Sequence, residues 1–510
     1  MFASALQTLL TPEVLIALFI GVVGGMIIGA MPGLSASMAV ALLIPVTYSM
    51  GAAAGLVMLT AVYTSAIYGG SITACLLHTP GTPSSAATAM DGYALTKQGK
   101  GLKAIGVATL CSMIGGTISA FCLLFIAPPL SKVVLSFSSL EYFLLAVFGL
   151  TIIGSVASDN MVKGLLSGCL GILVGIIGID IFSGTPRFTF GSINLESGIQ
   201  LVPAMIGLFS LSQVMISIED IVKGNNRILD KNATHLSGEM LPNRRELKSL
   251  MPTILQSSII GVLVGILPGA GGDIGSWISY NTAKKTSKHP EKFGHGSIEG
   301  VAASEAANNA VTGGALIPML TLGIPGSGVT AIMLGGLMIK GLNPGYKLFA
   351  ESGSITYCII FGFLLANILM GLIGILIAKQ VVKISVVPMT ILCPVILALS
   401  LIGAYAIRLN IFDVYVMLAF GLLGYFMRKF DFATAPVVLG MILGPMAEKN
   451  WRQAIVLFRG DALGYFFSRP ISIVLAILTI GALFFPIIVR IIKKKASPSA
   501  DTLENTARED

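Results

Sequence analysis

The chain has 510 residues, of which 55% are hydrophobic and only 11% are charged, and its formal net charge is +8. Soluble domains usually carry about 25% charged residues, so this composition excludes a soluble globular protein and indicates a surface that faces lipid. The basic residues lie mostly in loops and near the C-terminus, as the positive-inside rule predicts, and we expect no nucleic-acid partner.

Apolar segments long enough to enter a membrane recur along the whole chain. A complete span needs about 20 apolar residues, and because several segments are shorter or interrupted we expect roughly 10 to 14 crossings. The predicted fold is an all-α polytopic membrane protein with two structural repeats that contain Pro/Gly-broken helices or re-entrant hairpins. The candidate segments are 13–31, 36–48, 51–68, 103–128, 140–155, 161–182, 198–217, 250–268, 298–322, 326–343, 353–379, 385–405, 411–427, 432–446 and 470–492.

Two interruptions lie in the first half. The first is Met31-Pro-Gly-Leu-Ser-Ala-Ser37, and the second is Thr79-Pro-Gly-Thr-Pro-Ser-Ser-Ala-Ala-Thr88. Proline removes a backbone donor and glycine permits a turn, so each segment can break a helix. The N–H groups at such a break suit an anion, and the carbonyl groups suit a cation. The alternatives are a simple kink with GxxxG packing at the first break and an ordinary polar turn at the second.

A polar, basic stretch separates the apolar halves. We therefore predict a first membrane repeat at 1–217, a cytoplasmic linker at 218–249 and a second membrane repeat at 250–492. Lys493-Lys494-Lys495 directly follows the last span, so a cytoplasmic tail is expected at 493–510.

The landmarks of the first half recur in the second. GMIIGAMPG, which contains Gly25 and Gly29, matches GVLVGILPG at an offset of 236 residues. Gly69-Gly70 and the following Thr79-Pro80-Gly81 match Gly313-Gly314 and Ile324-Pro325-Gly326 at offsets of 244 to 245. Gly/Pro-interrupted segments at corresponding places in two halves point to the binding site of a transporter. An inverted repeat is favoured over a parallel one.

The second half therefore supplies its own pair of breaks, at Leu267-Pro-Gly-Ala-Gly-Gly-Asp273 and Gly323-Ile-Pro-Gly-Ser-Gly-Val-Thr330. Hydroxyl groups and free amides after a break can bind a carboxylate without a buried positive charge. The predicted substrate-binding residues are Gly33, Ser35, Thr79, Gly81, Ser84, Ser85, Thr88, Gly269, Gly326, Ser327 and Thr330.

A cation or proton site is predicted on the helical segment 299–312. Glu305, Asn308 and Asn309 share one side of a helix by their spacing, and an acidic residue inside a span is a functional hypothesis by default. The alternative is that the segment begins at the membrane interface, with Glu305 in water. His78 precedes a Pro-Gly break and is a further ion-coupling candidate, although a lone histidine is more often a packing residue.

Enzyme signatures are absent from the sequence. There is no GxxxxGK[ST], GxSxG or HExxH motif. The six cysteines form no CxxC pair, so neither a disulfide framework nor a metal centre is expected beyond a possible Na⁺ site. We expect no cofactor and no enzymatic activity.

Taken together, these segments resemble one family, the large membrane subunit of the tripartite tricarboxylate transporters. The resemblance covers most of the chain, although an Asn is usual in the family at position 78 and a Pro is common at 94 and 304, where this chain has His78, Ala94 and Ser304. It is carried by Pro32-Gly-Leu-Ser35, Tyr68-Gly-Gly-Ser-Ile-Thr-Ala74, Thr79-Pro-Gly-Thr-Pro-Ser-Ser85, Asp91-Gly-Tyr93 with Lys97-Gln-Gly99, Leu267-Pro-Gly-Ala-Gly-Gly272, Glu299-Gly-Val-Ala-Ala303, Glu305-Ala-Ala-Asn-Asn309, and Gly314-Ala-Leu-Ile-Pro318 through Pro325-Gly-Ser327.

The resemblance implies a three-part system in a bacterial inner membrane. Its other parts would be a small four-span membrane subunit and a periplasmic solute-binding protein that delivers citrate-like tricarboxylates or other organic acids. It also implies secondary active import, coupled to Na⁺ or H⁺. A trianion entering against about −100 mV works against roughly 7 kcal/mol, which a co-bound cation would offset. The alternatives are a passive channel or exporter for small organic anions, an intramembrane enzyme, and a non-transporting membrane scaffold.

Overall fold

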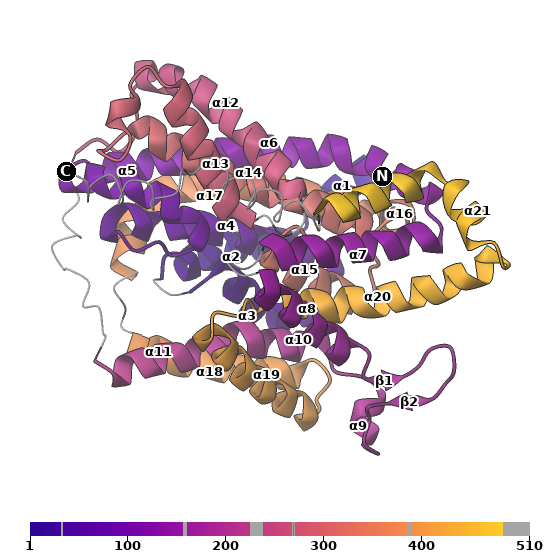
Figure 1. Ribbon diagram of the computed structural model, residues 1–510. Coiled ribbons are helices and arrows are strands. Elements are labelled where there is room, and N and C mark those ends of the chain that lie inside the picture. The colour runs from indigo at the N-terminus through magenta and orange to yellow at the C-terminus, as the bar shows by residue number, and fades with distance from the viewer. Residues whose placement is uncertain are drawn as a thin grey trace, which may run out of the picture.

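The computed structural model describes residues 1–31, 34–156, 161–224, 238–267, 269, 271–384, 387 and 389–482. These residues are helical almost throughout, and the helices run side by side along a common direction (Figure 1). Within the described part, the sheet structure is one short antiparallel hairpin of β1 (Gly178–Ile179) and β2 (Pro186–Arg187). The predicted class, an all-α polytopic membrane protein, is confirmed.

The first half consists of full spans and shorter helices in alternation. The segment Leu201–Val222 is one span built from α10, the π-helical η3 and α11. The first-half helices are α1 (Phe2–Leu9), α2 (Pro12–Gly29), α3 (Ala36–Tyr48), α4 (Ala52–Leu77), η1 (Pro83–Ser85), α5 (Ala86–Lys97), α6 (Gly101–Val133), η2 (Val134–Ser136), α7 (Ser139–Val156), α8 (Met161–Gly175), α9 (Ile193–Glu196), α10 (Leu201–Met205), η3 (Ile206–Leu211) and α11 (Ser212–Val222).

The second-half helix α12 starts at Arg244, inside the stretch predicted as the linker. Asn243 caps this helix by accepting a hydrogen bond from Glu246 N in a capping box, which explains the early start. The second-half helices are α12 (Arg244–Ile266), α13 (Gly271–Thr286), η5 (Pro290–Lys292), α14 (Ile298–Leu322), α15 (Gly328–Ile339), α16 (Tyr346–Ala350), α17 (Gly353–Ile384), α18 (Met389–Ala406), α19 (Ile411–Lys429), α20 (Ala435–Phe458) and α21 (Ala462–Phe467).

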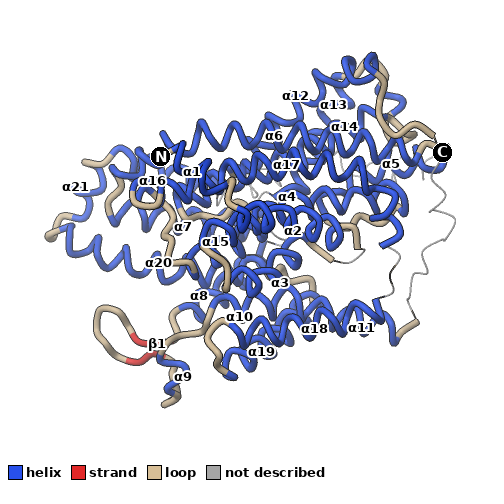
Figure 2. Tube along the Cα trace, turned by 180° about the vertical axis from the view of Figure 1, so that it is seen from behind, coloured by secondary structure: helices blue, strands red, loops and turns tan. Residues whose placement is uncertain are grey.

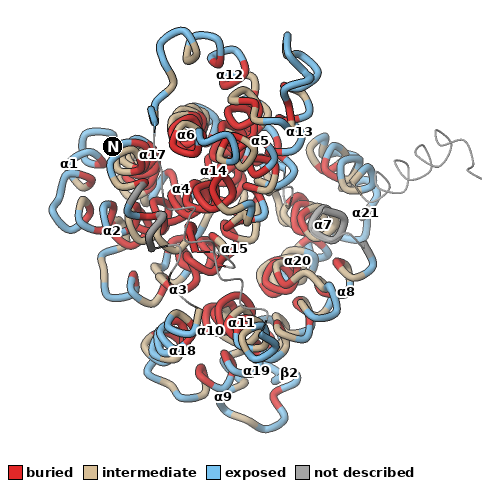
Figure 3. The backbone as a smooth tube through the Cα atoms, turned by 90° about the vertical axis from the view of Figure 1, so that its left-hand side faces the viewer, coloured by how far each residue is buried: buried red, intermediate tan, exposed pale blue. Residues whose placement is uncertain are grey.

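Two groups of apolar helices differ in length among the described residues. Eight are long and apolar enough to cross a membrane, and five apolar helices are shorter. The helices α3 and α15 belong to the shorter group, and each directly follows a predicted break. The outer helices expose large apolar side chains, such as Phe125 and Leu376, to the surroundings, whereas α4 and α14 are buried in the centre (Figure 3). The predicted number of 10 to 14 crossings stays a prediction.

Equivalent glycines hold equivalent helix pairs together in the two halves. A Cβ atom built on Gly25 of α2 would lie 2.6 Å from Val62 O of α4, and one built on Gly261 of α12 would lie 2.5 Å from Ala307 O of α14. These partners are separated by the offsets found in the sequence. The same holds for Gly29 on Ala66, Gly265 on Val311, Gly69 on Met26 and Gly314 on Val262. Such contacts let two backbones approach closely where a larger side chain would separate them.

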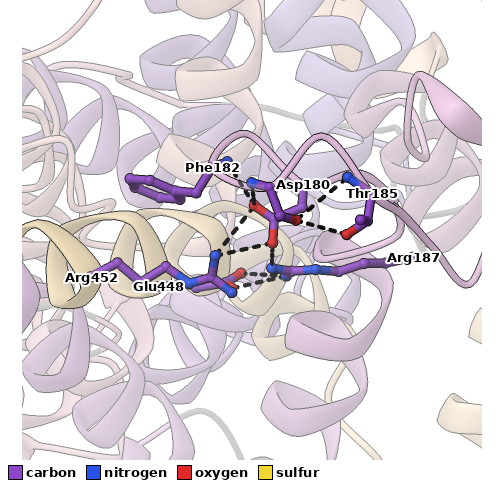
Figure 4. Close-up of polar contacts among 7 residues, drawn as sticks. Asp180, Phe182, Thr185, Arg187, Glu448 and Arg452 are labelled. Carbon is purple, nitrogen blue, oxygen red and sulfur yellow. Dashed lines mark hydrogen bonds and ion pairs between the residues drawn. The ribbon is translucent and has the colours of Figure 1, made fainter.

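A ring of four charged side chains fixes the β1–β2 hairpin to α20 (Figure 4). Arg187 and Arg452 each form ion pairs with both Asp180 and Glu448, and Arg452 Nη2 lies 2.8 Å from Glu448 Oε1. The hairpin projects beside α9 at one end of the bundle, away from α5 and α11 (Figures 1 and 2). The backbone N–H groups of Phe182 and Ser183, together with both guanidinium groups, hold the pKa of Asp180 well below its usual range.

Replacing Gly25 by Ala should destabilise the protein, because the added methyl group would meet the backbone of α4. Overpacking of this kind costs about 1–3 kcal/mol. The neighbouring Gly24 has nothing within 4 Å of its Cβ position, so Gly24→Ala is a matched control that should leave stability unchanged or slightly raised. Thermal unfolding of both variants in detergent would check this, and equal midpoints would contradict the proposed packing.

Replacing Asp180 by Asn should loosen the hairpin, which we would measure as faster proteolysis within 181–193. The pKa of Asp180 is lower in the folded protein than in the unfolded chain, where it is about 3.9, so the ionised carboxylate stabilises the hairpin. This stabilisation is complete above the unfolded pKa and is lost as the pH falls through the folded pKa. Acid should therefore speed cleavage by pepsin in the wild type and change it little in D180N. The exposed Asp220→Asn is the control and should retain the wild-type pH response.

Candidate functional site

The breaks place helix N-termini inside the protein. Ser35 caps α3 by accepting a hydrogen bond from Met38 N at 3.2 Å. Gly33 lies outside the described residues. In the second half, Ser327 caps α15 in a capping box, because Ser327 Oγ accepts from Thr330 N and Thr330 Oγ1 accepts from Ser327 N at 2.8 Å. A capping residue satisfies one N–H group of the first turn and leaves the others available to a ligand.

Two further helices begin at the same place. Gly269 N donates a hydrogen bond to Gly326 O at 3.0 Å, so the two second-half breaks are joined directly, and α13 begins at Gly271. The first-half counterpart is η1, which begins at Pro83 and leads into α5. The starts of α3, η1–α5, α13 and α15 thus converge from four separate segments.

A cavity of about 270 Å³ lies where these four helix starts meet. Many of its lining residues come in pairs that are separated by the two offsets of the sequence repeat. At 236 residues apart are Ser35 and Gly271, Ala36 and Gly272, and Ser37 and Asp273; at 245 apart are Thr82 and Ser327, Pro83 and Gly328, and Ser84 and Val329. The cavity is therefore built from equivalent pieces of both halves.

The lining offers hydroxyl groups and helix N-termini for an anion. Tyr63 Oη lies 3.3 Å from Ser327 Oγ, and Tyr63 and Phe209 add aromatic surface. None of the described lining residues is a Lys, Arg or His, and the charged one among them is Asp273. An anion in this cavity would consequently be held by helix dipoles and hydroxyl groups instead of by a cationic side chain.

Of the predicted substrate-binding residues, the structure brings Ser35, Ser84, Gly269 and Ser327 to the cavity. Others support the breaks from behind. Ser85 Oγ donates to Gly70 O and Thr82 O, and Thr330 is bonded to Ser327. Gly81 and Gly326 pack on the backbones of α2 and α12, where a Cβ atom would lie 2.3 Å from Gly29 O and 2.6 Å from Gly265 O. Thr79 donates to Leu77 O, and Thr88 contacts Glu305, so neither lines the cavity.

His78 is also separate from the cavity. It ends α4 in the left-handed conformation with φ of 52°, and its ring lies 4.8 Å from that of Tyr93. Gly323, which is 245 residues later, ends α14 with φ of 71°. Glycine and, less readily, asparagine and histidine adopt this conformation. The structure therefore gives His78 the role of a helix cap, and its side chain is exposed.

Glu305 is completely buried at the centre of the bundle. It accepts hydrogen bonds from Ser71 of α4 at 2.7 Å and from Ser112 of α6 at 2.8 Å, and also from Thr88 of α5. The alternative that Glu305 lies in water at the interface is therefore wrong. Its three partners are hydroxyl groups from three different helices, so the carboxyl group ties the central helix to its neighbours.

Asn308 and Asn309 are buried too but point in different directions. Asn309 Nδ2 approaches Thr64 Oγ1 and Met370 Sδ, on α4 and α17. Neither Oδ1 nor Nδ2 of Asn308 has a hydrogen-bond partner among the described residues. A Cβ atom on Gly272, which lines the cavity, would lie 3.0 Å from Asn308 Oδ1. Asn309 thus points away from Glu305, whereas the side chain of Asn308 interacts with the carboxyl group of Glu305 and lies directly behind the cavity wall.

Sequence reasoning missed several contributors. Ser71 and Ser112 bond to Glu305 from distant helices, and no local signal marks them. Tyr63 likewise contacts Ser327 from a distant helix and was missed for the same reason. In contrast, Asp273 could have been found, because the repeat offset aligns it with Ser37, next to a predicted break.

Comparisons with known proteins identify a family and two relatives. Residues 15–439 match the family described as "Tripartite tricarboxylate transporter TctA family". An uncharacterized 52.8 kDa protein in the TAR-I ttuC' 3'region of Agrobacterium vitis is 36% identical over 466 residues, which cover 91% of each chain. An uncharacterized protein in the TAR-II ttuC' 3'region of the same organism is 39% identical over 212 residues, 42% of this chain and 87% of that protein. No solved structure matches the chain.

The cavity should be accessible to water-soluble reagents. We expect a cysteine at Ser37, which lines the cavity, to react with a charged, membrane-impermeant thiol reagent in a Cys169→Ser background. A cysteine at the buried Ser85, behind the same wall, is the matched control and should be protected. Mass spectrometry of the labelled protein would report both, and equal labelling would contradict the described lining.

Proposed function

The chain belongs to the tripartite tricarboxylate transporter TctA family, and we propose that it carries small organic acids across the membrane through the cavity at the four helix starts. The family is one of transporter subunits and not of enzymes. The observation that carries the proposal is the convergence of α3, η1–α5, α13 and α15 on one polar cavity.

Helix starts are suited to carboxylates. Each helix N-terminus is equivalent to roughly half a positive elementary charge, so four of them amount to about +2. This distributed charge can offset part of the charge of a di- or tricarboxylate while the backbone N–H groups bond its oxygens. A transporter gains from this arrangement, because an anion held by partial charges can be released more readily than one paired with a buried arginine.

The carboxylate of Asp273 is the exception among the lining groups. A carboxylate repels a fully ionised acid but accepts hydrogen bonds and attracts cations. The site therefore favours an acid that brings a hydroxyl group or a co-transported cation into the cavity. Citrate-like hydroxy acids have this chemistry.

We also propose a membrane, an orientation and partner proteins for the chain. The chain is a multi-pass membrane protein, and we place it in the bacterial inner membrane with its C-terminus in the cytoplasm. Lys97, Lys223 and Lys284 lie at or near the ends of α5, α11 and α13, and these helices lie toward one end of the bundle, opposite the hairpin (Figures 1 and 2). By the positive-inside rule this end faces the cytoplasm. The proposed partners are a small four-span membrane subunit and a periplasmic solute-binding protein, with Na⁺ or H⁺ driving import.

Uptake into proteoliposomes tests this function. The chain would be reconstituted with its small partner subunit, the binding protein added outside, and labelled citrate, malate and succinate supplied under a Na⁺ or H⁺ gradient. Ser327→Ala should weaken apparent affinity about 10- to 100-fold, because a hydrogen bond to a charged group contributes about 1.5–3 kcal/mol. Ser136→Ala, at an exposed helix end, is the control and should behave as wild type.

The outcomes separate the alternatives. Accumulation above equilibrium that requires the binding protein supports import. Equilibration without a gradient indicates a passive channel or exporter, and no uptake of any acid indicates a scaffold. If Ser327→Ala had wild-type affinity, the result would contradict substrate binding in the cavity.

A further inference from the structure

We propose that Glu305 binds the coupling proton and exchanges it with the cavity by way of Asn308. The inference rests on the proposed transport function and goes beyond it by choosing the ion and the group that holds it. Three observations carry it: the burial of the carboxyl group, the hydroxyl groups around it, and the unpartnered amide between it and the cavity.

The surroundings of Glu305 offer it no counter-charge. None of the described lysine, arginine or histidine side chains forms an ion pair with it. The titratable groups that interact electrostatically with Glu305 are Tyr68 and Cys75 of α4 and Cys111 of α6. Asp91 of α5 is bound by Tyr280 of α13 and by the N–H groups of residues 294, 296 and 297. Asp273 of α13 lines the cavity itself.

A carboxyl group in such a place is costly when ionised and inexpensive when protonated. The proton itself can therefore serve as the counter-charge. Binding follows –COO⁻ + H⁺ → –COOH on Glu305, and no other bond forms or breaks. An ionised Glu305 would attract a proton from the cavity whenever the cavity opens to a more acidic side.

The hydroxyl shell suits both protonation states. In the ionised state Ser71 and Thr88 donate to Oε1 and Ser112 donates to Oε2. In the protonated state Oε2 donates to Ser112 Oγ, whose hydrogen turns toward a carbonyl group of α6, as that of Thr109 does toward Ile105 O. A metal cation would compete with the hydroxyl donors that hold both carboxyl oxygens, whereas a proton binds to one of these oxygens and leaves the donors to the other in place. The geometry favours H⁺ over Na⁺.

Asn308 connects this group to the cavity. It lies one helical turn beyond Glu305 on α14 and interacts with the carboxyl group of Glu305, and its amide atoms are fully buried without a hydrogen bond of ordinary geometry to the described residues. Buried polar atoms are almost always hydrogen-bonded to protein or water. Gly272 and Ser84, both in the cavity lining, flank Asn308 Oδ1: a Cβ atom on Gly272 would lie 3.0 Å from that oxygen and 2.8 Å from Ser84 Cβ. The absence of a side chain at Gly272 leaves the amide next to the cavity, where it can relay a proton through water.

The test compares driven uptake with exchange in Glu305→Gln. In proteoliposomes that are acidic outside, one proton per acid gives about tenfold extra accumulation per pH unit of gradient. We expect the wild type to show this dependence without added Na⁺. E305Q should lose it, while exchange of labelled for unlabelled acid continues and no longer varies with pH. Infrared difference spectra should show a protonated-carboxyl band on acidification that E305Q lacks.

Two further variants separate loss of the proton site from general damage to the protein. Glu305→Asp, which keeps the carboxyl group, should restore part of the proton-driven uptake. Glu299→Gln, on the same helix but bonded to Thr253 and Ser287 at its end, should behave as wild type. Proton-driven uptake in E305Q, or accumulation that follows the Na⁺ gradient alone, would overturn the proton site and leave the transport function standing. Absence of both uptake and exchange in the wild type would overturn both proposals.

Discussion

A helix that is interrupted inside a membrane exposes backbone groups that lipid cannot bond, and the architecture of this protein answers that constraint. The N–H groups at four interruptions turn inward to one polar cavity, where Ser35 and Ser327 satisfy part of them. The helices behind the breaks must then pack closely enough to exclude lipid. The glycines of α2 and α12 allow this, because α2 comes into backbone contact with α4 and α12 comes into backbone contact with α14.

The sequence predicted those features that depend on local chemistry or on repetition. The breaks and the α-helical class follow from proline and glycine residues at fixed spacing in an apolar chain. The residues that meet only through the tertiary fold could not be predicted, and the partners of Glu305 come from three separate helices. The backbone conformation of His78 accounts for its place at the end of α4, and its role in ion coupling stays a prediction.

A long helix with several polar side chains is among the most deeply buried. α14 carries Glu305, Asn308 and Asn309 through the centre, surrounded by α4, α6, α12 and α13 (Figure 3). Buried polar groups of this kind are expensive unless they are satisfied, so each one that remains unpartnered identifies a place where the protein interacts with something mobile. In this helix Asn308 has neither amide atom in a regular hydrogen bond, Asn309 lacks one only for Oδ1, and Asn308 lies beside the cavity lining.

The cavity is nearly symmetric but not completely so. Ser37 and Asp273 occupy corresponding positions in the two halves, and one is neutral while the other carries a carboxylate. A molecule with two identical ends, such as a symmetric dicarboxylic acid, would otherwise fit equally well in either of two orientations. Because a carboxyl group stands on only one side of the cavity, the two ends of such a molecule would meet different surroundings, and chemically equivalent groups would become distinguishable.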